Sequence, residues 1–420
     1  MCHALAASGP VGDVFVLSME NHNWVQPDNK FTGNIQQVYQ NPAALFLNSL
    51  VGGTAVANIN GTPTNISQQT AYAMNYHNVL ANTGGTANIH PSEPNYLWSE
   101  GGTNFGVLND NQPFGTGGTN QTTTQHLTSL MQQQGVRWKS YQEGIDLAKN
   151  GSNQLTNNVL PQNQWTVPLT NFSGTSPAYT NPYNGSHQFD YAVKHNPMAF
   201  FTDTNGGNNT TPTNPLSMNY LPLEQLQTDL SNNTVARYNW ITPDQFNDMH
   251  TGLSGGFNYN GTLFTGDQAK IAQGDNFLSQ IIPTIMSSQA YQNNGAIIIW
   301  WDETETDGVA GDRADNLSHT IGEILISSLA HPNVGGLPFV STADLTHSDD
   351  LKTMQDIFGV YSNLGSPYLG DARNANGLNS LFAADVIPAS AVPEPTTYAF
   401  FGAGALGLII ILRRWSQRRS

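Results

Sequence analysis

The sequence predicts an α/β fold, a three-layer sandwich with a largely parallel central sheet. Two apolar runs, residues 12–19 and 295–301, lack polar alternation, as is typical of strands buried on both faces of a parallel sheet. Helical patterns lie between them, and alternating strand and helix signals favour this fold class. A chain of 420 residues, 38% of them hydrophobic, is long enough to bury a sizeable core.

Helices are expected at five places between and after these strands: 41–51, 124–134, 223–231, 275–289 and 351–358. A shorter helix is expected where Ser92 fits the N-cap and Pro94 the first turn, continuing through 95–99. Residues 150–220 are mostly Asn, Thr, Pro, Gly and Ser, so we interpret them as long surface loops or an insertion bordering the site. Residues 10–388 show no internal repeat and no clear linker, which predicts one domain.

The charge of the chain limits its possible functions. Only 10% of residues are charged, and the 14 basic residues include four arginines within the last eight positions. The rest of the chain has 10 basic residues against 30 acidic ones, a net charge near −20 that excludes nucleic-acid binding as a main role. An anionic substrate would need a metal ion to invert the local field. Cys2 is the only cysteine, which excludes a thiolate zinc site and a disulfide scaffold.

The two ends of the chain carry features of export. Residues 1–9 resemble the small-residue cleavage region of a signal peptide and are interpreted as its remnant, with a plain N-terminus as the alternative. At the other end, Pro-Glu-Pro at 393–395 precedes an apolar run, 398–412, and then an arginine cluster. This run gives about 22 Å of helix, which is short for a bilayer core of roughly 30 Å.

The segment 389–420 resembles a PEP-CTERM sorting tail with a short transmembrane segment. That resemblance implies processing by an exosortase-type membrane protease, and an ordinary tail anchor is the alternative. In either case the arginines stay on the cytoplasmic side of the membrane, and the rest of the chain lies outside the cytoplasm. The protein is therefore expected to be exported to the cell envelope or beyond, held transiently in the membrane by its tail.

Acidic and amide side chains follow both predicted strands. Glu20-Asn21 ends the first strand and Asp302-Glu303 ends the second. Ligand sites in open α/β sheets lie at the carboxyl ends of the strands, and carboxylate and amide oxygens suit a hard divalent cation. Alone, either pair is explained by a loop cap; two such pairs in one chain predict a metal site.

Three further segments carry candidate chemistry. Ser92 lies at a helix N-terminus, whose positive end attracts anions, and beside a metal it is expected to attack phosphorus, a bare structural cap being the alternative. Asp244, Asn247, Asp248 and His250 lie within seven positions, with the two aspartates on one face if the segment is helical. These side chains suit the binding of a second cation or of phosphate oxygens. The alternative is a capped loop without chemistry. His319 and His347 each lie in a polar loop before an apolar segment.

Taken in order along the chain, these segments resemble the phosphoesterase family that contains bacterial acid phosphatases and phospholipases C, within the alkaline-phosphatase superfamily. The resemblance spans roughly residues 13–382. Its motifs are Val16-Leu17-Ser18-Met19-Glu20-Asn21-His22, His90-Pro91-Ser92-Glu93-Pro94-Asn95-Tyr96, Trp138-Lys139-Ser140-Tyr141-Gln142-Glu143, Ile241-Thr242-Pro243-Asp244 with Asn247-Asp248-Met249-His250, Trp301-Asp302-Glu303 and His347-Ser348.

The resemblance implies a metal-dependent phosphate-ester hydrolase with an alkaline-phosphatase-like fold. Its implied metal ligands are Glu20, Asn21, Asp302 and Glu303, with Asp244 and Asp248 for a second ion. Ser92 is the implied nucleophile, forming a phosphoserine that water then hydrolyses, while His250 or His347 protonates the leaving oxygen. Asn95, Asn247 and His319 are the candidates for substrate contacts. Superfamily members with two firmly bound metals usually have Asp-His where this chain has Asp302-Glu303, so one or two divalent ions are expected, and this departure favours one.

Two other functions fit the same sequence. A phospholipase C or other phosphodiesterase would use the same site with room for a second substituent. A non-enzymatic envelope or matrix protein would explain the Asn- and Thr-rich composition and the tail, but not the two acidic strand ends. A sulfatase is a poorer fit, because no Cys or Ser lies in the required C/S-x-P-x-R context.

Overall fold

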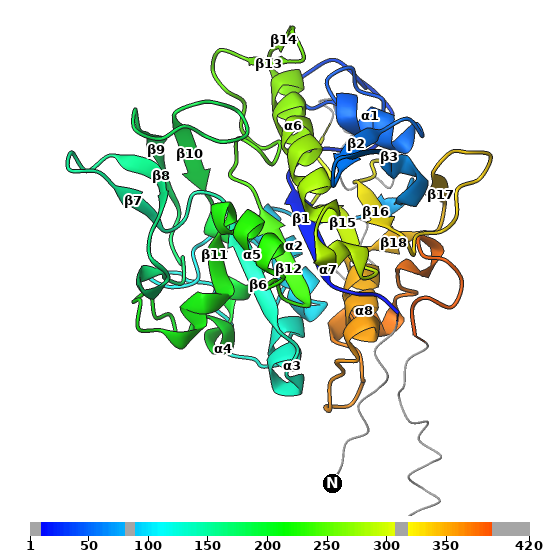
Figure 1. Ribbon diagram of the computed structural model, residues 1–420. Coiled ribbons are helices and arrows are strands. Elements are labelled where there is room, and N and C mark those ends of the chain that lie inside the picture. The colour runs from blue at the N-terminus through cyan, green and yellow to red at the C-terminus, as the bar shows by residue number, and fades with distance from the viewer. Residues whose placement is uncertain (1–9, 80–88, 307–317, 389–420) are drawn as a thin grey trace, which may run out of the picture.

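The computed structural model describes residues 10–79, 89–306 and 318–388. Its central sheet has eight strands: β1 (Val14–Met19), β4 (Thr70–Ala73), β6 (Trp138–Gln142), β11 (Tyr220–Pro222), β12 (Tyr238–Thr242), β15 (Ala296–Trp301), β16 (Glu323–Ser327) and β17 (Phe339–Ser341). Their spatial order is β11-β6-β12-β1-β15-β16-β4-β17. Every neighbouring pair is parallel except the two pairs of β16. The predicted largely parallel sheet is confirmed (Figure 1).

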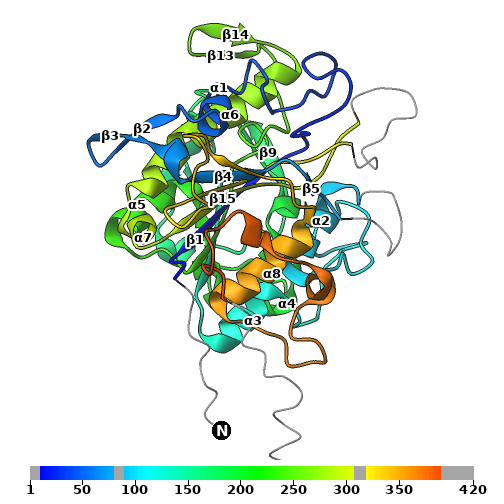
Figure 2. The ribbon, with the colours of Figure 1, turned by 90° about the vertical axis from the view of Figure 1, so that its right-hand side faces the viewer.

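Helices cover both faces of this sheet, which gives the predicted three layers (Figure 2). One face carries α1 (Leu45–Val51), α5 (Leu226–Asn232), α6 (Asp267–Met286) and α7 (Gln289–Gln292). The other face carries α2 (Ser92–Gly101), α3 (Leu127–Gln134), α4 (Thr202–Asn205) and α8 (His347–Phe358). Parallel strands buried on both faces explain why β1 and β15 are apolar at every position.

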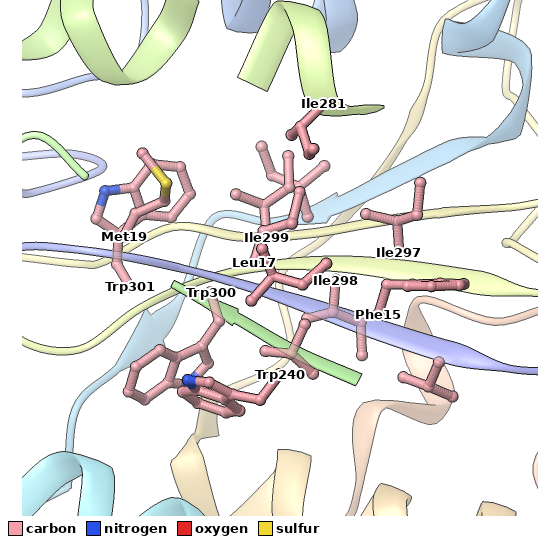
Figure 3. Packing of buried hydrophobic residues seen from close by; sticks show 14 of the residues in the cluster. Phe15, Leu17, Met19, Trp240, Ile281, Ile297, Ile298, Ile299, Trp300 and Trp301 are labelled. Atoms are coloured by element: carbon pink, nitrogen blue, oxygen red, sulfur yellow. The ribbon is translucent and has the colours of Figure 1, made fainter. Parts of the chain in front are cut away.

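The core follows the alternation of side chains along these strands. Figure 3 shows Leu17, Ile299 and Trp301 on the side of α6, near its Ile281, with Trp300 and Trp240 on the opposite side. All six are at most 5% exposed. Burying a large apolar side chain stabilises the folded state by roughly 1.5–3 kcal/mol. Packing on both faces therefore holds β1 and β15, and with them their carboxyl ends, firmly in place.

Short two-stranded ladders surround the main sheet. They are β2 (Val56–Ile59) with β3 (Thr62–Asn65), β5 (Tyr76–His77) with β18 (Leu345–Thr346), β7 (Leu147–Lys149) with β8 (Leu155–Val159), β9 (Phe172–Thr175) with β10 (Gln188–Tyr191), and β13 (Phe257–Tyr259) with β14 (Thr262–Phe264). The two hairpins β7–β8 and β9–β10 occupy much of 150–220. That segment borders the site as predicted, but its residues 191–201 are mostly buried, so surface loops are a wrong description of them.

Helix boundaries differ from the predictions where caps decide them. The helix α8 begins four residues early, at His347, because Thr346 and Asp349 form a capping box. The predicted helix 275–289 begins at Asp267 and breaks after Met286. The prediction of Ser92 as an N-cap is wrong: Pro91 takes that position and Ser92 is the first helical residue.

The membrane-related predictions concern residues that the structure does not describe. The predicted span 398–412 and the possible signal-peptide remnant 1–9 both lie outside the described residues. Within the described ranges, every helix is too short or too polar to cross a bilayer.

Candidate active site

The carboxyl ends of β1 and β15 bring the two acidic pairs together. Met19 pairs with Trp301 in the parallel register, so Glu20 and Asp302 leave the sheet side by side. The amide of Asp302 donates to the Met19 carbonyl (3.3 Å), and the amide of Asn21 donates to Asp302 Oδ1 (3.1 Å). Asn21 reaches this position with a φ of 38°. The predicted meeting of the two strand ends is thus present.

Ser92 lies directly opposite these residues. Its Oγ is 3.2 Å from Glu20 Oε2, 3.4 Å from Asn21 Oδ1 and 3.3 Å from Glu303 Oε1. We call Ser92, Glu20, Asn21, Asp302 and Glu303 the serine cluster. Because Ser92 is the first residue of α2, its hydroxyl lies at the positive end of the helix dipole.

Neighbours of Ser92 hold Glu303 in place. His90 Nδ1 lies 2.8 Å from Glu303 Oε2, and Asn95 Nδ2 donates to the same oxygen (3.3 Å). Asn95 also donates to the Ile89 carbonyl (3.0 Å), while its own Oδ1 is buried without a hydrogen-bond partner. Asn95 therefore borders the serine cluster with one acceptor unused.

The cluster holds more negative charge than its surroundings neutralise. Burial, then the Glu20 charge, raises the pKa of Asp302 well above its ordinary value. Burial, followed by Glu305 and Glu20, does the same for Glu303. Burial also opposes ionisation of Glu20, but the nearby His195 cation outweighs it and lowers the pKa of Glu20 to about 2. Added positive charge would stabilise this arrangement.

The donor atoms of the cluster suit a hard divalent cation, although they are not gathered around one point. In the described ranges, no three His, Cys, Asp or Glu side chains are assembled as a metal-binding group. The cluster instead offers three carboxylates, one amide oxygen and one hydroxyl, and Asp302 Oδ2 is buried without a hydrogen-bond partner. All of these are hard oxygen ligands, so the chemistry of the set fits Mg²⁺, Mn²⁺ or Ca²⁺.

Two basic residues that the sequence predictions omitted border Ser92. Lys194 Nζ lies 3.3 Å from Ser92 Oγ and 2.9 Å from Asp110 Oδ2. Burial opposes the charge of Lys194, but Glu20 and Asp110 raise its pKa above the ordinary value, so it is a cation beside the serine.

His195 lies between two carboxylates. Its Nε2 is 3.2 Å from Glu20 Oε2 and its Nδ1 is 3.4 Å from Asp248 Oδ2, ion-pair contacts whose angles fall outside hydrogen-bond geometry. Burial lowers its pKa, but the Glu20 charge outweighs burial and the net pKa is about 9. The ring stacks on Tyr96 (5.2 Å between centroids), whose hydroxyl donates to Glu20. Adjacent basic residues in a weakly charged segment were the only signal for Lys194 and His195.

The second group of predicted ligands lies at the ends of β6 and β12. Asn247 Nδ2 donates to both carboxylate oxygens of Glu143 (2.9 Å each), and the amide of Asp244 also donates to Glu143 (2.9 Å). Asn181 Nδ2 donates to Glu143 (2.8 Å) and to Asp244 (3.3 Å). We call these four residues the amide cluster. Asp244 and Asn247 thus bond to Glu143 and Asn181 and not to Ser92, and residues 243–251 are turns, so the helical interpretation is wrong.

Asp248 and His250 lie between the two clusters. The Asp248 carbonyl accepts from the Glu20 amide (2.8 Å), and Asp248 Oδ1 accepts from the His250 amide (2.8 Å). Burial lowers the pKa of His250 to about 4, and its Nδ1 contacts Thr251 Oγ1 (3.0 Å). Near neutral pH this ring is uncharged, which does not favour the predicted role as a proton donor.

The two late histidines are both buried. His347 Nε2 contacts the Asp302 carbonyl (2.6 Å), behind the serine cluster, and burial lowers its pKa to about 3. Because both of its ring nitrogens contact protein atoms, its predicted role as the proton donor to substrate does not fit its position. His319 accepts through its carbonyl from His77 Nδ1 (3.1 Å), and its predicted substrate contact stays a prediction.

Comparisons of sequence and structure identify similar proteins. A probable acid phosphatase of Kluyveromyces lactis is 26% identical over 310 residues, covering 74% of this chain and 56% of that protein. An acid phosphatase of Aspergillus fumigatus is 24% identical over 290 residues, covering 67% and 47%. The chain therefore spans about half the length of the curated relatives it matches. The solved lipoteichoic acid synthase LtaP of Listeria monocytogenes is 10% identical with a TM-score of 0.41, covering 92% of this chain and 78% of that one.

Two family profiles match the sequence itself. Residues 391–414 match the PEP-CTERM protein-sorting motif, as predicted for the tail. Residues 12–361 match the Phosphoesterase family, a range that contains every residue of the serine cluster. This chain belongs to the Phosphoesterase family.

Proposed function

We propose that the protein hydrolyses phosphate monoesters with Ser92 as the nucleophile. The observation that supports this most strongly is the contact of Ser92 Oγ with Glu20, Asn21 and Glu303 at the meeting point of two strand ends. Family membership and the similarity to acid phosphatases point to the same bond type.

The proposed first step transfers the phosphoryl group to the serine. The Ser92 hydroxyl proton passes to Glu303 Oε1, an acceptor 3.3 Å away whose pKa is raised, as Oγ attacks phosphorus. The bond from phosphorus to the ester oxygen breaks, and the alcohol leaves with the proton held by Glu303. Lys194 and the positive end of the α2 dipole stabilise the charge on the phosphoryl oxygens.

The second step returns the serine. A water molecule attacks phosphorus, the bond from phosphorus to Oγ breaks, and the water proton restores the hydroxyl by way of Glu303. Asn95 Oδ1, the buried acceptor without a partner, is placed to orient the substrate or the water. Ser92 Oγ already lies within 3.4 Å of Glu20, Asn21 and Glu303, so the proton moves only a short distance in each step.

The same proposal includes a divalent cation. Glu20, Asn21, Asp302 and Glu303 would hold it, and when bound it would supply positive charge that lowers the proton affinity of the Ser92 hydroxyl and of the bound phosphate. The residues at the amide cluster are not proposed as ligands, because amide nitrogens already donate to their carboxylates.

Hydrolysis of p-nitrophenyl phosphate by Ser92→Ala tests the proposal. We expect turnover to fall at least about 10³-fold, because the nucleophile is lost. Ser99→Ala is the matched control: it removes a hydroxyl from the same helix, one that donates to the Tyr96 carbonyl (2.7 Å), and is expected to keep turnover. Full activity of Ser92→Ala would reject the serine mechanism. Faster release from bis-(p-nitrophenyl) phosphate would assign the diesterase alternative.

We also infer that the chain is exported and processed at its tail. The sorting motif at 391–414 supports cleavage by an exosortase-type protease near Pro-Glu-Pro. Mass spectrometry of protein recovered from an exosortase-bearing host would show loss of the tail, and an intact tail at the cell surface would contradict it.

A further inference from the structure

The first turn of α8 contacts both elements that carry the serine cluster. His347 Nε2 donates to the carbonyl of Asp302, directly after β15, at 2.6 Å. The next residue, Ser348, accepts at Oγ from the indole of Trp98 in α2, at 2.8 Å. Because α2 begins with Ser92, one helical turn lies against both the nucleophile helix and the carboxylate strand.

This turn is itself held from several directions. The strand β18 pairs with β5, with Leu345 opposite Tyr76. This pairing holds Leu345 and Thr346, the two residues directly before α8. The capping box of Thr346 and Asp349 closes the start of the helix. Asp349 Oδ1 further accepts the amides of two residues in a later loop, Asn376 and Gly377 (2.8 and 2.9 Å). The turn has little freedom to move away from either element.

The hydrogen bonds also determine the orientation of the His347 ring. Trp300 Nε1 can only donate, so at 3.0 Å it donates to His347 Nδ1 and leaves the ring proton on Nε2. Nε2–H then donates to the Asp302 carbonyl. Tyr76 Oη lies 2.8 Å from the same Nδ1 and donates to Asp350. The ring is buried, so it holds the Asp302 carbonyl through a hydrogen bond and does not contact substrate.

We propose that His347 and Ser348 are positioning residues that set the separation between Ser92 and the carboxylates of Asp302 and Glu303. The inference rests on the proposed function, since it concerns the same reaction. Misplacing reacting groups by about 1 Å can cost about 10²-fold in rate. Two hydrogen bonds from one rigid turn are therefore enough to matter for turnover while leaving substrate contacts untouched.

The test compares two substitutions at His347 with one at Ser348. His347→Phe keeps the ring but removes the donor, and we expect kcat to fall about 10²-fold with KM within about threefold of wild type. His347→Gln keeps an N–H donor and is expected to recover to within about tenfold. Ser348→Ala is expected to lower kcat about fivefold, because the hydrogen bonds of its Oγ with Trp98 and Asp371 are both lost. His331→Phe, where a remote ring stacks on Phe339, is the matched control.

A crystal structure of each variant gives a second readout that needs no activity. The distance between Ser92 Oγ and Glu303 Oε1, 3.3 Å here, is expected to change in His347→Phe and to be kept in His347→Gln. A folded His347→Phe with wild-type kcat and an unchanged distance would overturn the proposal. If that variant does not fold, a folded Ser348→Ala with wild-type kcat and an unchanged distance would overturn it. An inactive wild type would instead reject the proposed function, and the distances would still decide the positioning.

Discussion

Two buried groups of carboxylates lie along the same edge of the sheet, and they differ in what surrounds the charge. In the serine cluster, Asp302 and Glu303 face other carboxylates, and Asp302 Oδ2 has no hydrogen-bond partner. In the amide cluster, both oxygens of Glu143 accept from Asn247, and Asn181 donates to Glu143 as well. Both groups follow parallel strands, so position at the edge does not distinguish them. The donors around each carboxylate do.

This difference teaches how a buried acid becomes a site or stays a structural element. An acid whose oxygens already accept amide hydrogens has less to gain from a cation, because those donors compensate part of its desolvation. An acid crowded by like charges gains from any positive group that enters. We therefore expect substitutions in the serine cluster to change activity and substitutions in the amide cluster to change stability.

The largest effect is expected at Asp302. Asp302→Ala removes one of the carboxylates proposed to hold the cation, and we expect turnover of p-nitrophenyl phosphate to fall about 10³-fold. Stability should not fall, since a buried like charge is removed along with the side chain. Chemical denaturation measured alongside turnover checks both. Activity near that of wild type would remove the distinction between the clusters.

A substitution in the amide cluster should act in the opposite way. Asn247→Leu removes the amide that donates to both oxygens of Glu143, leaving this buried acid with only the donors of Asn181 and Asp244. We expect the free energy of unfolding to fall by about 2–3 kcal/mol, with kcat within about threefold of wild type. Asn258→Leu, at an exposed position, is the control for the added apolar surface. A large loss of kcat in the folded Asn247→Leu protein would place this cluster in the reaction.

Lys194 tests whether positive charge beside Ser92 matters by itself. Lys194→Met keeps the length of the side chain and removes its charge 3.3 Å from Ser92 Oγ. We expect kcat/KM to fall about 10- to 30-fold, because the phosphoryl oxygens lose one cation. Lys149→Met, at an exposed position in β7, is the matched control. Equal kinetics in the two variants would show that Lys194 serves only its ion pair with Asp110.

The smallest expected effect is a pH dependence from Glu143. Burial raises the pKa of Glu143 from 4.5 to about 7. Between these values the folded protein binds more protons than the unfolded chain, so this group makes stability fall as pH rises. Its contribution is about 1 kcal/mol between roughly pH 5 and 6. Glu143→Gln should flatten that slope in urea unfolding at several pH values, and an unchanged slope would assign it to other acids.

The fold and all five residues of the serine cluster could be predicted from the sequence. The runs ending at Met19 and Trp301 are apolar without interruption, so both strands, and the acids that follow them, were correctly predicted. The parallel register then brings these acids together, and Ser92 joins them from a helix start that its motif indicates.

The remaining residues depend on contacts that no local pattern encodes. Lys194 and His195 lie in a loop-rich segment and reach Ser92 and Glu20 only because the chain folds back over the sheet edge. Asp244 and Asn247 have the composition of ligands, yet their direction is set by Glu143 and Asn181, far away in sequence. His347 was predicted to protonate the leaving oxygen, but its ring contacts a main-chain carbonyl.

Element analysis of the purified protein tests the contrast between the two clusters most directly. The wild type, Asp302→Ala and Asp244→Ala would be dialysed against the same divalent ion and their bound metal counted by mass spectrometry. We predict bound metal in the wild type and in Asp244→Ala, and its loss in Asp302→Ala. Metal kept by Asp302→Ala and lost from Asp244→Ala would contradict the assignment, and so would a wild type that binds none.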